Sequence, residues 1–292
     1  MNEEFLVEPK GFNSALELKY LLEKFGFFQG RFIGKFPKDW QKQIYHDISA
    51  LPDLEQARIK RLVEKSKDSL VPSGQPFEPS RSWLENAHQQ VEQKRFSGVV
   101  AAKPNQWGYP DFSEVDEGYL MGGHDVRVLG QAKYYTDIAR RLLQLSHEIV
   151  WVDPYLHLDK SACEKVISGF LEVAQQGKCR SFVVWAREEK SGMKGYRQML
   201  ERKYQPKLVK GSRLVVKLVD DGGSVEKIHA RLMLSTLGGF RFDQGFAEIP
   251  DNRYVDIAIL DKKTHDHHCR WYLDPGSPND FNIVEEHIIE GR

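Results

Sequence analysis

The spacing of apolar residues divides the chain into an amino-terminal part that favours helices and a carboxyl-terminal part in which helices and strands alternate. In the first part, apolar residues recur at helical spacing. Asn13 or Ser14 is placed to cap the first helix, and Ser82 with Glu85 forms a capping box ahead of the last. Residues 1–115 are therefore predicted to be mostly helical. The expected helices cover 14–25, 38–48, 52–69 and 83–93, and one short strand covers 96–102.

Residues 104–123 are rich in proline, glycine, asparagine and acidic residues, so we predict a loop and a domain boundary there. Beyond it, short apolar runs bounded by turn residues alternate with helical patterns, which predicts an α/β domain over residues 120–292. The expected form is a mixed sheet flanked by helices. Its expected strands are 148–153, 181–186, 213–218, 227–234, a second strand after the Gly238-Gly239 turn that reaches residue 246, 255–260 and 269–273. Its expected helices are 131–146, 161–176, 196–204 and 282–290.

Composition points to an ordinary globular protein of 292 residues with 40% hydrophobic and 29% charged residues. No apolar run approaches the ~18–20 residues that cross a bilayer, and the acidic amino terminus does not have the pattern of a signal peptide. The three cysteines are scattered, which fits reduced thiols in a cytoplasmic protein. We expect no disulfide, no metal and no cofactor.

The net charge is zero, but the charges are segregated along the chain. Residues 187–217 hold ten Lys and Arg against three Glu, whereas residues 243–292 hold eleven acids against five bases. A basic face of this kind favours an anionic partner such as nucleic acid. The alternative, that the two segments neutralise each other within one fold, stays open.

The strongest candidate for chemistry is the pair His229 and Arg231 at the start of the predicted strand 227–234. Residues two apart on a strand point to the same face, so the two side chains are expected to converge. A nucleophile or proton carrier beside a permanent cation suits the handling of phosphate.

Three stretches in this order resemble the phospholipase D-like domain found at the carboxyl terminus of microtubule-interacting-and-trafficking (MIT) proteins and in related small bacterial proteins. The resemblance covers about residues 120–275. It is carried by Trp151-Val-Asp153-Pro154-Tyr155-Leu156, by Ile228-His229-Ala-Arg231, and by Gly238-Gly239 with Gly245-Phe246. It implies a phospholipase D-like sheet, and it implies binding of a phosphodiester or of anionic lipid headgroups.

In the wider superfamily, the resemblance implies that a histidine attacks phosphorus, a lysine neutralises the phosphate and an aspartate and an asparagine complete the site. His229 matches the nucleophile, and Arg231 stands where the lysine is expected. Thr236 and Phe246 occupy the places of the aspartate and asparagine. A complete site also needs two such motifs. The second could come from 268–279 of this chain or, in a homodimer, from a second copy of His229.

Further candidates follow from position and charge. Asp153 and Glu188 lie at the ends of two predicted parallel strands, where α/β folds collect functional groups. Asp153 could instead form an Asp-Pro turn, and Glu188 could be a solvated charge. The basic segment could track phosphates or form a solvated helix face, and Tyr196 and Tyr204 are available in it for stacking. Its candidate phosphate-binding residues are Lys190, Lys194, Arg197, Arg202 and Lys203.

His265, His267 and His268 resemble a metal-binding cluster in composition. They fall in a predicted hairpin loop, where we expect exposed side chains and no metal site.

The leading hypothesis is a bacterial protein that binds, and in an active version cleaves, nucleic acid in a defence or DNA-processing system. Cleavage would be a metal-independent phosphodiesterase reaction through His229. Two alternatives stay open: a non-catalytic binder of anionic lipid headgroups, and an adaptor subunit of a multi-protein complex.

Overall fold

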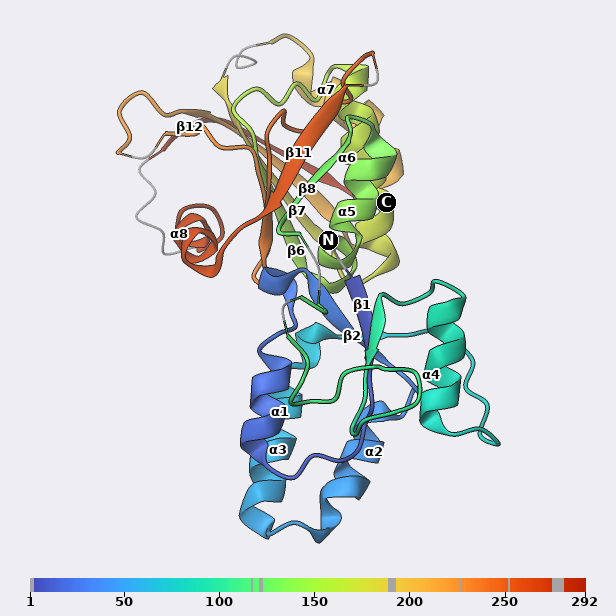
Figure 1. Cartoon of the computed structure of the whole chain (residues 1–292). Helices are drawn as coiled ribbons and strands as arrows, with labels where there is room; N and C mark the ends of the chain where they lie inside the picture. The colour runs from blue at the N-terminus through green and yellow to red at the C-terminus, as the bar shows by residue number, and fades with distance from the viewer. Residues whose placement is uncertain are drawn as a thin grey trace. The chain divides into compact units, whose positions relative to one another are not determined.

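The structure is a computed structural model that describes residues 3–116, 118–120, 123–188, 193–225, 227–251, 253–274 and 281–292. The chain forms two compact units, Met1–His124 and Asp125–Arg292. Each unit combines helices with a sheet of its own (Figure 1), which confirms the α/β class. None of the helices in the described part of the chain has the length and apolar character that a membrane span requires.

The amino-terminal unit is built on a four-stranded parallel sheet in the order β3-β2-β1-β4. The strands are β1 (Glu3–Val7), β2 (Arg31–Lys35), β3 (Leu70–Pro72) and β4 (Gly98–Val100). The helices are α1 (Ala15–Leu22), α2 (Trp40–Asp47), α3 (Asp53–Lys65) and α4 (Trp83–Glu92). The capping box predicted ahead of α4 is confirmed.

Alternation along β1 distributes the core of this unit over both faces of the sheet. Phe5 and Val7 pack in one cluster with apolar residues of α1, α2 and α3, whereas Leu6 packs in a second cluster with residues of α4. Successive side chains of a strand point to opposite faces, so a strand covered on both sides must be apolar at nearly every position. Figure 1 shows α4 on the opposite side of this sheet from α1 and α3.

The prediction of a mostly helical amino-terminal part is corrected in one respect. The predicted elements included a strand at β4 but none at β1, β2 or β3, so the parallel sheet was not predicted. These strands are three to five residues long and pair only with strands distant in the sequence. Parallel pairing of this kind leaves no hairpin signal in the local sequence.

The carboxyl-terminal unit has an eight-stranded mixed sheet in the order β12-β8-β7-β6-β9-β10-β11-β5. Strands β6, β7 and β8 are parallel, and the other pairs are antiparallel. The strands are β5 (Asp125–Leu129), β6 (Glu148–Val152), β7 (Ser181–Arg187), β8 (Arg213–Asp220), β9 (Leu232–Leu234), β10 (Gly239–Phe242), β11 (Tyr254–Ile259) and β12 (Asn282–Glu290).

The helices of this unit are α5 (Ala132–Leu145), α6 (Ser161–Gln176), α7 (Tyr196–Tyr204) and α8 (Lys262–Tyr272). Figure 1 shows α5 and α6 on one side of the sheet and α8 on the other. The predicted helices 131–146, 161–176 and 196–204 are confirmed to within two residues, and so are the predicted strands 148–153, 181–186 and 213–218.

Two predictions near the carboxyl end are wrong. Residues 269–273 belong to helix α8, whose inward positions His265, Cys269 and Tyr272 have helical spacing but include no aliphatic residue that would have marked it. Residues 282–290 form strand β12 and not a helix. An irregularity in its pairing with β8 between Ile283 and Glu285 interrupts the alternation that normally reveals a strand.

Candidate functional site

Five polar residues gather at one edge of the large sheet. The parallel strands β6, β7 and β8 end there, and β9 begins there because Leu232 pairs with Val152 at the end of β6. The end of β10 reaches the same edge through the pairing of Arg241 with Leu232. Open α/β sheets bind ligands beyond the carboxyl ends of their strands. The residues that follow or flank these strand ends are Asp153, Arg187, Asp221, Arg231 and Asp243.

Asp153 is the buried centre of this edge, with 3% of its surface exposed. Its Oδ1 accepts the N–H of Tyr155 at 2.9 Å, and its Oδ2 accepts the N–H of Phe246 at 3.3 Å. Burial raises the pKa of Asp153, while the two hydrogen bonds and the charge of Arg231 act against that rise. Asp153 thus makes a turn contact with Tyr155 two residues ahead and also lies beside the cation of Arg231.

Arg231 reaches Asp153 from the chain segment that leads into β9. Its Nε lies 3.9 Å from Asp153 Oδ1, and its Nη1 donates to the carbonyl oxygen of Asp243 at 3.0 Å. The side chain keeps 30% of its surface exposed. The guanidinium is thus held in place on one side and open to solvent on another.

The turn after β10 can pack over these two residues only because it contains Gly245. Its φ is +75°, and a Cβ added there would lie 2.3 Å from Asp153 Oδ2 and 3.0 Å from Arg231 Cδ. Any larger residue would push the carboxylate and the arginine apart. Glycine at position 245 is therefore required both by the backbone conformation of the turn and by the close packing on Asp153 and Arg231.

Tyr155 forms an exposed aromatic surface beside two cations. The residue is 49% exposed, and the guanidinium carbons of Arg231 and Arg187 lie 5.3 Å and 5.8 Å from its ring centroid. Arg187 also lies 3.4 Å from Asp221 Oδ2, an oxygen that accepts the N–H of Ile228 at 2.8 Å. The contribution of Tyr155 was not predicted, although it stands two residues beyond Asp153 in the segment that carries the resemblance.

His229 is not placed as predicted. It is exposed and lies outside β9, and no hydrogen bond or ion pair links it to another residue in the described ranges. The predicted strand cannot begin at residue 227, because continuing the pairing of β9 with β6 would place Ala230 opposite Pro154, which has no N–H to donate. The structure joins Arg231 to Asp153 but does not join His229 to either.

Glu188 follows β7 as an exposed residue, and no hydrogen bond or ion pair joins it to another residue in the described ranges. Lys190 lies outside the described residues. In the rest of the basic segment, Arg197 pairs with Glu201 at 3.0 Å and Lys203 pairs with Glu164 at 2.8 Å. Lys194 and Arg202 are exposed.

The stacking role considered for Tyr196 and Tyr204 is wrong, since both rings are buried. Apolar packing and the hydrogen bond from the Tyr204 hydroxyl to the carbonyl oxygen of Leu158 hold α7 against its own unit. The two ion pairs neutralise Arg197 and Lys203 within the fold, but their acids, Glu201 and Glu164, do not belong to residues 243–292. The alternative that the two charged segments neutralise each other is therefore not decided by these pairs.

The expectation of exposed histidines in a hairpin loop is wrong for the loop, because these residues belong to α8, and for His265, whereas His267 is exposed as expected. His265 on α8 is 3% exposed, and its Nε2 lies 2.8 Å from the carbonyl oxygen of Ser235 and 3.2 Å from Cys269 Sγ. Burial raises the pKa of Cys269 to about 12, so its thiol stays protonated at neutral pH. Over the described residues, no group of three His, Cys, Asp or Glu side chains is arranged to hold a metal ion.

No protein-family model matches the chain, and no curated protein matches it. Among solved structures, the chain is similar to TrmBL2, described as an archaeal chromatin protein with a novel mode of DNA binding. The two share 10% sequence identity over 77% of this chain and 82% of that chain, with a TM-score of 0.28. A likeness at this TM-score does not establish a shared fold.

Proposed function

We propose that the carboxyl-terminal unit binds single-stranded nucleic acid at the edge formed by Tyr155, Arg187 and Arg231, and that it does so without cleaving the strand. The observation that supports this is the exposed ring of Tyr155 with two guanidinium groups within 6 Å of its centroid. We also propose that residues 120–275 form a phospholipase D-like domain, as the resemblance of their sequence implies.

The chemistry of this cluster suits a nucleotide. An exposed aromatic ring provides a surface on which a base stacks, and each such stack is worth about 1–3 kcal/mol. A guanidinium offers a planar fork of donors that matches two oxygens of a phosphate. Arg231 is oriented by Asp153 and by the Asp243 carbonyl oxygen, so little side-chain entropy is lost when a phosphate binds.

Two features favour binding over cleavage. A nucleophilic histidine needs a partner that orients it and a second group that protonates the leaving oxygen, and His229 is exposed and is not joined to Asp153 or Arg231. Phe246, which stands where the superfamily has an asparagine, is a core residue whose ring packs against Phe170 and Phe242. A core phenylalanine cannot hydrogen-bond a phosphate.

The test is a fluorescence anisotropy titration of the full-length protein with labelled single-stranded DNA and RNA oligonucleotides over a series of salt concentrations. Arg231→Gln removes one phosphate contact and should weaken binding by about tenfold. It should also reduce the slope of log K against log salt by about one. The matched control is Arg140→Gln, because Arg140 is a partly exposed arginine of helix α5 in the same unit.

Unchanged affinity in Arg231→Gln, or no binding to either oligonucleotide at low salt, would refute the proposal. A parallel sedimentation assay with phosphoinositide-containing liposomes separates the lipid alternative. Binding to these liposomes that requires Arg231, together with no binding to oligonucleotides, would replace nucleic acid by lipid headgroups as the ligand. A stoichiometric protein partner without any phosphate affinity would favour the adaptor alternative.

A further inference from the structure

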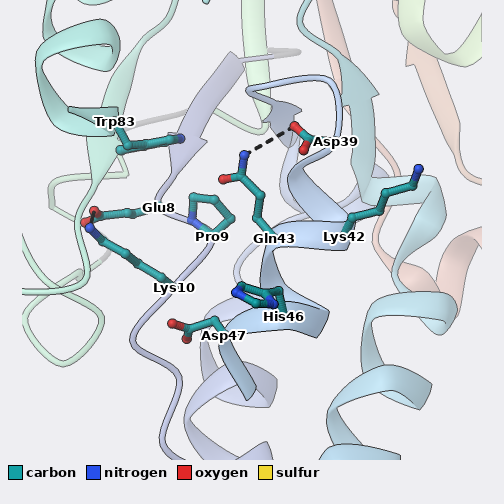
Figure 2. Close-up of a pocket in the computed structure, with 9 residues that line it drawn as sticks. All are labelled: Glu8, Pro9, Lys10, Asp39, Lys42, Gln43, His46, Asp47 and Trp83. Atoms are coloured by element: carbon teal, nitrogen blue, oxygen red, sulfur yellow. Dashed lines mark hydrogen bonds and ion pairs between the residues drawn. The ribbon is translucent and has the colours of Figure 1, made fainter. Parts of the chain in front are cut away.

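The amino-terminal unit contains a cavity of about 530 Å³ that the function proposed above does not use (Figure 2). Its volume lies within the range of roughly 300–1,000 Å³ that is usual for small-molecule sites. All of its walls come from this one unit. Its lining includes Glu8, Pro9, Lys10, Gln43, Asp47 and Trp83.

The cavity lies where the topology of the parallel sheet predicts a binding crevice. From β1 the chain moves to β2 and β3 on one side of the sheet, whereas β4 lies on the other side of β1. The carboxyl ends of β1 and β4 therefore mark the switch point, outside which open α/β sheets bind their ligands. Glu8, Pro9 and Lys10 directly follow β1. A second cavity of about 360 Å³ shares Glu8, Lys10 and Asp47 and reaches the loop after β4 at Ala102–Pro104.

Gly11 holds the loops after β1 and β4 together at this point. Its φ is +83°, and an added Cβ would lie 2.8 Å from the Cβ of Ala102. Its N–H donates to Asp47 Oδ2 at 2.7 Å. This bond fixes one oxygen of the Asp47 carboxylate, and Oδ1 makes no hydrogen bond within the described residues. Asp47 therefore offers a ligand a fixed acceptor.

The charges in the cavity favour a ligand that donates hydrogen bonds over one that carries phosphate. Glu8 is 2% exposed, and its Oε1 lies 3.0 Å from Lys10 Nζ while its Oε2 accepts the N–H of Ala102 at 2.8 Å. Lys10 is thus already paired. The other lysine of the lining, Lys42, points away from the other labelled side chains in Figure 2. Within the described residues, Asp47 Oδ1 thus remains an open acceptor, whereas Lys10 is paired and Lys42 is directed elsewhere.

The apolar part of the wall is flat and fixed. The indole of Trp83 is 8% exposed and donates from Nε1 to the carbonyl oxygen of Phe36 at 2.7 Å, so the ring cannot turn freely. Pro9 adds a rigid, buried ring. The amide of Gln43 donates to Asp39 Oδ1 at 3.2 Å and lies beside Pro9, on the side away from Asp47, in Figure 2. A flat heterocycle packs against such a wall, and hydroxyl groups reach the carboxylates.

We propose that this cavity binds an uncharged nucleoside, with its base against Trp83 and Pro9 and its ribose hydroxyls toward Asp47. The proposal is independent of nucleic-acid binding by the carboxyl-terminal unit.

The test is isothermal titration calorimetry of the full-length protein with adenosine, guanosine, cytidine and uridine, each compared with its 5′-monophosphate. At least one nucleoside should bind, and about tenfold more tightly than its monophosphate, because the phosphate would meet the acceptors of the cavity. Asp47→Asn should weaken that binding by about tenfold, since it removes a charged acceptor.

Asp47→Asn leaves an oxygen to accept the N–H of Gly11, so the fold should survive; circular dichroism and urea unfolding check this. The matched control is Asp53→Asn, because Asp53 is an exposed acid at the start of α3 that does not line the cavity. The proposal fails if none of the four nucleosides binds at millimolar concentration, if a monophosphate binds more tightly than its nucleoside, or if Asp47→Asn binds as the wild type does. Arg231→Gln should not affect nucleoside binding, so the two proposals can fail separately.

Discussion

The guanidinium of Arg231 lies 3.9 Å from the buried carboxylate of Asp153, measured from Nε to Oδ1. The two residues belong to different strand ends, and the pairing of β9 with β6 brings them to one edge of the sheet. The carboxylate oxygens of Asp153 accept hydrogen bonds from two backbone N–H groups. Arg231 is therefore oriented by the charge of Asp153 at a distance longer than a hydrogen bond. The cation is therefore positioned without being fully neutralised.

Tyr155 should contribute to binding through its ring and not through its hydroxyl. Tyr155→Ala removes the stacking surface and should weaken the affinity for single-stranded oligonucleotides roughly 5- to 150-fold. Tyr155→Phe keeps the ring and should bind nearly as the wild type does. Anisotropy titrations at one fixed salt concentration compare the three proteins. A loss of equal size in the phenylalanine variant would show that stacking is not the cause.

Gly245→Ala should destabilise the carboxyl-terminal unit by more than about 2 kcal/mol, because the added Cβ meets Asp153 Oδ2 in a left-handed backbone conformation. Gly223→Ala is the matched control, since no atom lies within 4 Å of its added Cβ and its φ is not in the left-handed range. It should change stability by no more than about 0.5 kcal/mol. Urea unfolding followed by circular dichroism measures both variants. Equal stability of the two would contradict the packing described for Gly245.

His229→Ala should leave both stability and oligonucleotide binding unchanged, because the side chain is exposed and makes no described hydrogen bond. The wild-type protein should likewise release no product from labelled single-stranded DNA or RNA in the presence of EDTA. Gel analysis of overnight incubations checks this. Metal-independent cleavage that disappears in His229→Ala would instead establish a histidine nucleophile and overturn the non-catalytic proposal.

The carboxyl-terminal unit should lose stability as the pH falls from about 6.5 to about 4. Burial, reinforced by the charges of His267, Arg241 and His265, lowers the pKa of His268 from 6.5 to about 4. Below pH 6.5, His268 therefore binds a proton in the unfolded state but not in the folded state, which lowers the free energy of unfolding. This loss of stability is complete once the pH falls below the folded-state pKa. Because the ring is partly open to solvent, we expect a loss of about 1–2 kcal/mol.

Replacing His268 tests whether this residue causes the loss of stability at low pH. His268→Gln cannot titrate and should show a smaller loss of stability between pH 7 and pH 4 than the wild type. Urea unfolding at several pH values measures the difference. Parallel pH profiles of the two proteins would show that other groups cause the acid sensitivity.

Local sequence determined the elements whose pattern is complete within one stretch. Helix α6 was predicted with its observed bounds because its apolar positions recur at helical spacing, and α4 was predicted from the Ser82–Glu85 capping box. Strands β6 and β7 were predicted as buried strands, and β8 as a strand, from short apolar runs. Asp153 and Arg231 were chosen for their position and charge, and these two are in contact.

Only the tertiary structure decided the features that depend on distant partners. The short strands β1 and β2 are stabilised by parallel pairing across the amino-terminal unit, and a pairing irregularity conceals β12. Whether a charged residue is available for a ligand also depends on its partners, since Lys203 is paired with Glu164 whereas Arg231 keeps an open side. His229 lies outside β9 because Pro154, two residues beyond β6, cannot extend the pairing. Sequence thus supplied the residue types, and pairing between distant segments determined which of them meet.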